Sequence, residues 1–252
     1  MIPTPDSPLV GLFRASPNHG ERRDGRRADW IVLHYTGMPT GEEALARLCD
    51  PAAEVSCHYM VWEDGRIFQL VPERRRAWHA GASRWRGEPD MNSSSIGIEI
   101  VNPGHVDGAT TPFPAAQIDA VAALCRDICA RNAIAPNHVL AHSDIAPGRK
   151  IDPGEAFPWE RLAELGVGYF PRALKPFICD PSREGDHGER VAELQTDLAR
   201  YGYDIVADGD FGPRTCQVVA AFQRRFRRAR VDGVADVETV ALLRALIAQD
   251  NA

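Results

Sequence analysis

A histidine and an aspartate separated by a short loop carry the densest chemistry of the sequence. His142 follows an apolar run that predicts a strand, so its imidazole lies at the strand's C-terminal end, where catalytic groups often emerge. Asp152 is too distant to share a helix face with His142, but the turn-forming Pro147 and Pro153, each followed by glycine, can fold the chain back. Both side chains could then bind one metal ion. The alternative is a polar surface loop in which they only cap turns.

A third candidate ligand, His34, lies near the end of a predicted strand over residues 30–36, which is apolar and rich in β-branched residues. A lone histidine packed in the core is the alternative for this position. Lys150 precedes Asp152 by two residues, so in an extended segment the two side chains point the same way. A cation beside a metal is suited to stabilising a developing oxyanion.

Glu99 is a carboxylate within an apolar strand. Ile96, Ile98 and Ile100 alternate along a predicted strand over residues 95–102, which places Glu99 on the opposite face beside Gly97. A carboxylate in so apolar a strand is costly unless it is paired or functional. Gly97, which has no side chain, leaves open space next to it.

The elements that must position these residues alternate between strands and helices. Residues 55–62 and 66–71 predict a hairpin around an Asp-Gly turn, and an amphipathic pattern over 113–132 predicts a long helix. Residues 1–29 show no sustained periodicity and predict an irregular arm. The fold class expected is α/β, with a mixed β-sheet flanked by helices.

The C-terminal part predicts a separate small three-helix domain over residues 185–252, joined by a linker over 166–184 to a catalytic domain over 1–165. Helical patterns cover 188–200, 213–227 and 237–248. The second and third helices have matched openings that begin at Asp208-Gly209 and Asp232-Gly233, which indicates an internal near-repeat.

Substrate contacts are expected from the hairpin and from the loop that follows it. His58 and Tyr59 point to opposite faces of the first hairpin strand, and either could line a cleft. Trp78 and His79, close to Gly81, are typical of a wall that binds sugar or peptide, although a loop tryptophan can equally be a buried anchor.

Composition limits the class of protein. The 252 residues carry a net charge of −6, which argues against a general nucleic-acid binder, and no apolar run approaches the ~20 residues of a membrane span. The N-terminus lacks the basic and apolar regions of a secretory signal, so a cytoplasmic location is expected, with the periplasm or cell wall as the alternative if another route exports the chain. Cys125 and Cys129 are expected to be buried thiols rather than a zinc half-site.

With these residues in view, the first domain resembles the zinc-dependent N-acetylmuramoyl-L-alanine amidases of the AmpD/AmiD type, which share the fold of peptidoglycan recognition proteins. The resemblance covers roughly residues 17–165, and the tail resembles a peptidoglycan-binding module. Several motifs that occur in the same order support this resemblance, and together they are more specific than any single motif. They are Ile31-Val-Leu-His34, Ser56-Cys-His-Tyr59, Ala77-Trp-His-Ala-Gly81, Asn92 with Ser95-Ile-Gly-Ile-Glu99, and the run from His142 to Gly154.

The resemblance implies a role for each matching residue. His34, His142 and Asp152 become the Zn²⁺ ligands, and Glu99 and Lys150 the catalytic residues. The expected substrate contacts are His58, Tyr59, Trp78, His79 and Asn92.

The implied reaction is hydrolysis of the amide bond between N-acetylmuramic acid and L-alanine in peptidoglycan or muropeptides, with the tail tethering the enzyme to the polymer. Two other functions stay open: a recognition protein that binds peptidoglycan without cleaving it, and a zinc peptidase that cuts within the stem peptide. Neither a nucleic acid nor a membrane is an expected partner, and the sequence leaves the oligomeric state open.

Overall fold

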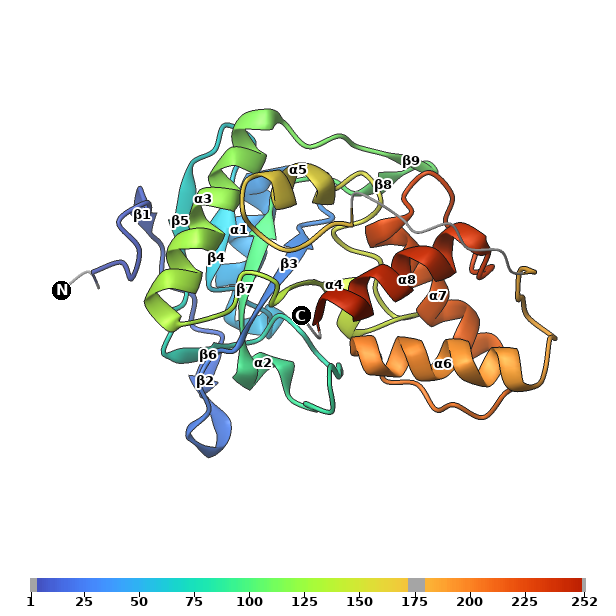
Figure 1. Cartoon of the computed structure of the whole chain (residues 1–252). Coiled ribbons are helices and arrows are strands. Elements are labelled where there is room, and N and C mark those ends of the chain that lie inside the picture. Colours follow the sequence, from blue (N-terminus) through green and yellow to red (C-terminus); the bar gives the residue numbers. More distant parts are fainter. Residues whose placement is uncertain (1–3, 172–179, 251–252) are drawn as a thin grey trace. The chain divides into compact units, whose positions relative to one another are not determined.

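The computed structural model describes residues 4–171 and 180–250, so part of the predicted linker over 166–184 lies outside the described residues. Its centre is a six-stranded sheet (Figure 1). The strands follow the spatial order β1 (Leu12–Phe13), β5 (Ile67–Gln69), β4 (Tyr59–Val61), β7 (Ser95–Ile100), β3 (Trp30–Tyr35) and β10 (Val139–Ala141). Strands β4 and β5 form the predicted antiparallel hairpin, and the other neighbouring pairs are parallel. The expected mixed α/β fold is confirmed.

The sheet is covered on both faces, which explains the nearly continuous apolar sequence of its central strands. Tyr59 points toward α3 (Ala115–Asn132), where its hydroxyl shares Glu73 with Arg131 of that helix. The next residue, Met60, points the opposite way and packs in a cluster with Ala44 and Leu48 of α1 (Gly41–Cys49). Helices α3 and α1 therefore cover opposite faces (Figure 1).

The remaining helices of this region are short. They are α2 (Met91–Ser94), α4 (His142–Ile145) and α5 (Trp159–Glu164), with 3-10 turns at Arg23–Gly25 and Pro51–Ala53. Thr40 caps α1, because its side-chain oxygen accepts a hydrogen bond from the Glu43 N–H at 3.2 Å.

The N-terminal region is more ordered than the irregular arm predicted for it. Strand β1 extends the sheet beside β5, and β2 (His19–Glu21) pairs antiparallel with β6 (Arg75–Ala77). A second small hairpin joins β8 (His105–Val106) to β9 (Ala109–Thr110). Strands of two or three residues have no periodicity of their own, and their hydrogen bonds come from distant partners.

The chain divides into two compact units. The first comprises Met1–Ala82, Asp90–His142 and Asp152–Tyr169, and the second comprises Ser83–Pro89, Ser143–Ile151 and Phe170–Ala252. Two segments from within the predicted catalytic domain thus cluster with the C-terminal helices. The predicted domain boundaries stay a prediction.

The C-terminal helices are α6 (Glu189–Tyr201), α7 (Pro213–Phe226) and α8 (Val237–Asp250), close to the predicted ranges. Two buried glutamines explain the near-repeat. Gln195 of α6 donates to Asp208 and accepts from the Gly209 N–H, and Gln223 of α7 donates to Asp232 and accepts from the Gly233 N–H. Each glutamine therefore fixes the Asp-Gly turn that opens the following helix.

No helix in the described part of the chain is long and apolar enough to cross a membrane. The cellular compartment stays a prediction.

Candidate metal centre and active site

The three predicted metal ligands come together in the first unit. Strands β3 and β10 are parallel neighbours with Leu33 opposite Ala141, so the residues that follow, His34 and His142, lie side by side at the same end of the sheet. Asp152 reaches them from the returning loop, as the turn residues around it predict. All three residues are buried, with exposures of 1%, 3% and 7% in sequence order.

Their donor atoms form a nearly equilateral triangle. The Nδ1 atom of His34 lies 2.9 Å from Nδ1 of His142 and 3.0 Å from Oδ2 of Asp152, and the third side, between His142 Nδ1 and Asp152 Oδ2, is 2.9 Å. The group satisfies the geometry of a metal-binding cluster within the described residues.

The outer nitrogen of each imidazole is already engaged. His142 Nε2 lies 3.2 Å from the carbonyl oxygen of Ala80, which can only accept, so Nε2 carries the proton and Nδ1 presents a lone pair to the triangle. The Ser95 hydroxyl donates to the carbonyl oxygen of Met91, so it accepts from His79 Nε2. His79 Nδ1 then accepts from His34 Nε2 at 3.1 Å, which leaves His34 Nδ1 as the inward lone pair. Outer hydrogen bonds of this kind fix the ring orientation and tautomer of metal-binding histidines.

The donor set fits a divalent metal. Two imidazole nitrogens and one carboxylate oxygen are common zinc ligands, and tetrahedral coordination at bond lengths of ~2.0–2.1 Å sets the donors about 3.3 Å apart. The observed 2.9–3.0 Å separations therefore need only a few tenths of an ångström of relaxation. Three electron-rich atoms at this spacing repel one another unless a cation lies among them.

Asp152 is held in the charged form that metal binding requires. Burial alone would raise the pKa of its carboxyl, but when a proton occupies the triangle the charge and hydrogen bonds of His142, and then those of His34, outweigh burial and place the pKa below its usual value. A bound metal cation would take the place of that proton. A deprotonated carboxylate is therefore available for a metal across the physiological pH range.

Glu99 lies on the same face of the sheet as His34. The two residues are opposite each other in the parallel register of β7 and β3, and paired positions of neighbouring strands project to the same side. Glu99 is half-buried, whereas Ile98 and Ile100 are fully buried on the other face, as the alternation predicts. A carboxylate thus stands on the strand next to a metal ligand.

Lys150 is half-buried and follows a tight turn in which the carbonyl oxygen of Ala146 accepts from the N–H groups of Arg149 and Lys150, both at 3.1 Å. It belongs to the segment Ser143–Ile151 of the second unit. Its part in oxyanion stabilisation stays a prediction.

His79 supports the candidate metal centre, a role that the sequence did not indicate. Its ring fills the space above Gly97, where an added Cβ would lie 2.4 Å from the ring, and its Nδ1 meets His34 Nε2. Burial, then the charges of His34 and His58, hold the pKa of His79 well below its usual value, so the ring is neutral. The sequence signal was the glycine in an otherwise apolar strand, which marks a close approach.

Asn92 positions the segment that carries His79. Its side-chain oxygen accepts from the N–H groups of His79 at 2.9 Å and Ala80 at 2.8 Å, so one buried amide fixes both residues that contact the imidazole ligands. Trp78, the residue before His79, is only half-buried and keeps an exposed surface that a substrate could contact.

His58 is a buried core histidine. It has no exposed surface, its Nδ1 accepts from the Gly97 N–H at 2.9 Å, and its Nε2 lies 3.0 Å from the Arg75 carbonyl oxygen. Burial, followed by the charge of Arg22, lowers the pKa of His58 to about 3. With both nitrogens occupied, the ring offers no substrate contact in this structure.

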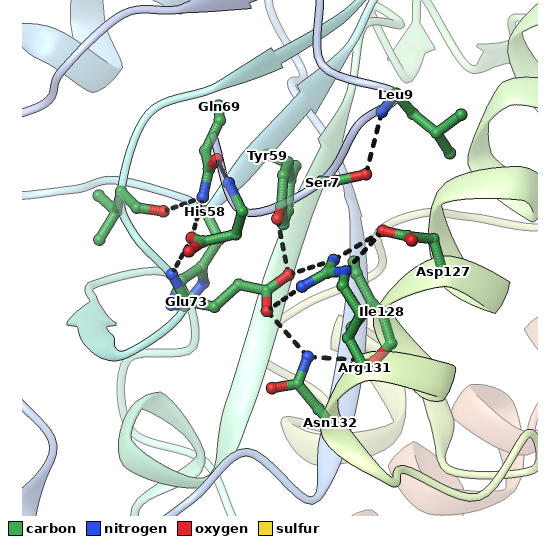
Figure 2. Close-up of polar contacts among 12 residues, drawn as sticks. Ser7, Leu9, His58, Tyr59, Gln69, Glu73, Asp127, Ile128, Arg131 and Asn132 are labelled. Atoms are coloured by element: carbon green, nitrogen blue, oxygen red, sulfur yellow. Dashed lines mark hydrogen bonds and ion pairs between the residues drawn. The ribbon is translucent and has the colours of Figure 1, made fainter. Parts of the chain in front are cut away.

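Tyr59 is equally buried, within a polar network that the sequence did not indicate (Figure 2). Its hydroxyl donates to Glu73 at 2.6 Å, and Arg131 and Asn132 of α3 donate to the same carboxylate at 2.7–2.8 Å. Arg131 also pairs with Asp127. The network ties α3 to the loop after β5, so Tyr59 is structural here.

We expect Tyr59→Phe to lower the free energy of unfolding by about 1 kcal/mol, because one buried hydrogen bond is lost while Arg131 and Asn132 still satisfy Glu73. The value of kcat/KM should stay within about twofold of the original chain's, since no substrate contact is removed. Chemical denaturation and steady-state kinetics check this. A tenfold loss of kcat/KM at unchanged stability would instead return Tyr59 to the substrate cleft.

Cys125 and Cys129 are buried free thiols, as predicted. Burial raises the pKa of both, which disfavours the thiolate that zinc would need. A further cysteine, Cys179, lies outside the described residues.

Comparison with known proteins agrees with this geometry. The family model described as N-acetylmuramoyl-L-alanine amidase matches residues 24–155, and a model for a putative peptidoglycan binding domain matches residues 187–243. The first match spans more than half of the chain and includes all three residues of the triangle. The chain belongs to the N-acetylmuramoyl-L-alanine amidase family, whose members are hydrolases.

Two individual relatives cover different shares of this chain. The N-acetylmuramoyl-L-alanine amidase AmiD of Escherichia coli K12 is 43% identical over 229 residues, which cover 86% of this chain and 81% of AmiD. The 1,6-anhydro-N-acetylmuramyl-L-alanine amidase AmpD of Enterobacter cloacae is 34% identical over 164 residues, covering 58% of this chain and 85% of AmpD.

Solved structures extend the similarity to the whole fold. A complex of E. coli AmiD with the substrate anhydro-N-acetylmuramic acid-L-Ala-D-gamma-Glu-L-Lys matches with a TM-score of 0.76 and 40% identity, covering 94% of this chain and 93% of that one. AmpDh3 from Pseudomonas aeruginosa matches with a TM-score of 0.72 and 30% identity over the full length of both chains.

Proposed function

We propose that this amidase uses zinc, and that His34, His142 and Asp152 hold it. The triangle of donor atoms with sides of 2.9–3.0 Å carries the proposal, because the outward hydrogen bonds of the two imidazoles leave their inward nitrogens, with the Asp152 carboxylate oxygen, as three lone-pair donors. A bound zinc ion would lower the pKa of water toward ~7 and polarise the scissile carbonyl group.

The substrate bond is the amide between the lactyl group of N-acetylmuramic acid and L-alanine, in peptidoglycan or in smaller muropeptides. The solved complexes of AmiD with anhydro-N-acetylmuramic acid-L-Ala-D-gamma-Glu-L-Lys and of AmpDh3 with an anhydromuramic pentapeptide support this choice. Trp78, half-buried at the edge of the segment that supports the metal ligands, is the side chain we assign to the substrate wall.

Glu99 acts as the general base. Its carboxylate, on the same sheet face as His34, accepts a proton from the attacking water and then passes it to the departing amine of L-alanine. Lys150 presents an ammonium group to the carbonyl oxygen as negative charge develops there. The products are the glycan or anhydro-sugar and a stem peptide with a free N-terminal L-alanine.

Labelling of new amines in the products tests the proposal, because amidase cleavage exposes the amine of L-alanine and no other. A new amine on a residue further along the stem would indicate a peptidase. Binding of muropeptide without any new amine would indicate a recognition protein.

A further inference from the structure

The C-terminal unit holds the loop that joins two of the proposed metal ligands. Residues 143–151 follow His142 and end at Asp152, and they include Lys150, yet they cluster with the helices α6 to α8. Within this segment Ser143 to Pro147 are buried. The loop is therefore a packed part of the second unit.

A buried ion pair holds this loop within the second unit. Asp144 is 0% exposed, and its two carboxylate oxygens are bound separately: Oδ2 by Arg225 Nη1 at 2.7 Å and Oδ1 by the hydroxyl of Tyr203 at 2.9 Å. Arg225, near the end of α7, has a side-chain exposure of only 2%. A charge pair desolvated to this degree fixes its partners firmly, because either group left alone would be an uncompensated buried charge.

Further contacts hold the same loop at positions that follow Asp144. The Arg84 N–H donates to the carbonyl oxygen of Ile145 at 2.9 Å, and Arg214 Nη1 donates to that of Pro147 at 3.1 Å. Gly148 has a φ of +80°, and a Cβ added there would lie 2.3 Å from the side chain of Gln217. The backbone is thus fixed at successive positions up to the turn that leads into Lys150.

We propose that Arg225 and Tyr203 are positioning residues for catalysis, an inference that rests on the function proposed above. By binding Asp144 they set the path of the loop that carries Lys150 and connects His142 to Asp152. Both residues act through their contacts with Asp144. The C-terminal unit accordingly contributes to hydrolysis of a small muropeptide, in addition to any tethering on the polymer that its sequence predicts.

The chain offers a matched control. Arg227, two residues further on, is also an ion-paired arginine with little exposure, but it binds Asp236, Glu238 and the carbonyl oxygen of Arg230. All of these partners lie outside the loop. Arg225→Met and Arg227→Met therefore each remove the ion pairing of a buried arginine in the second unit, and only the first releases Asp144.

The test compares the full-length variants on a small soluble anhydromuropeptide, with hydrogen exchange of residues 143–151 as a readout independent of activity. We expect Arg225→Met to lower kcat by ~10–100-fold with KM within about threefold, because misplaced catalytic groups cost turnover more than binding. Exchange over 143–151 should rise. Arg227→Met should leave kcat and that exchange near those of the original chain, and Arg225→Lys should restore part of kcat because it keeps the charge.

Equal kcat and equal loop exchange in Arg225→Met and Arg227→Met would overturn the positioning role. If Arg225→Met does not fold, Tyr203→Phe serves as the second variant, because it removes only the hydroxyl that binds Asp144. We expect it to lower kcat by about threefold or more. Unchanged kcat and unchanged loop exchange in Tyr203→Phe would also overturn the positioning role. Failure of the proposed function gives a different result, because the unaltered chain would then release no L-alanine amine while the exchange comparison still stands.

Discussion

Replacing His34 or Asp152 by alanine is expected to strip the metal from the protein and to lower kcat/KM by at least ~10³-fold, because several kcal/mol of transition-state stabilisation depend on the metal and each 1.36 kcal/mol is tenfold in rate. Each donor comes from a different part of the chain, so two remaining ligands bind weakly. Elemental analysis of the purified variants measures the first effect and steady-state kinetics the second.

His187→Ala is the matched control for this experiment. Its side chain is 70% exposed and pairs only with Asp210 among the contacts described for it. The control should keep its metal and its activity. Full metal content in His34→Ala or Asp152→Ala would remove that residue from the ligand set.

The second large effect separates chemistry from metal binding. Glu99→Gln keeps the shape of the side chain but cannot accept a proton, so turnover should fall by ~10²-fold or more while metal content and KM change little. Steady-state kinetics alongside elemental analysis checks both parts.

Glu63→Gln is the corresponding control, since Glu63 lies exposed in the turn between β4 and β5. It should behave as the original chain does. Near-normal turnover in Glu99→Gln would rule out its role as the base, and loss of metal would make Glu99 a ligand instead.

The three residues of the triangle could be found from sequence as candidate ligands because each lies at a recognisable strand end or turn. His34 ends an apolar β-branched run, His142 follows another, and the turns around Asp152 return the chain. The long helix α3 and the helices of the second unit have enough turns for their apolar period to be visible. These are the elements whose local pattern and tertiary role agree.

The supporting residues could not be predicted because their roles depend on long-range packing. His79 meets His34 across 45 positions of sequence, and Arg225 meets Asp144 across 81. Tyr59 was expected near substrate, but the direction of its side chain depends on which face of the hairpin α3 covers, and the structure directs it to Glu73. Sequence periodicity indicates that a strand has two faces without indicating what covers each.

Mass spectrometry of an anhydromuropeptide digest, with and without a metal chelator, tests directly whether this chain is a zinc-dependent amidase that cuts before L-alanine. We expect two products, the anhydro-sugar and an intact stem peptide that begins with L-alanine. Both should disappear after chelation and return when a stoichiometric amount of zinc is added. Undiminished cleavage by fully metal-free protein, or a cut at a bond within the stem peptide, would contradict it.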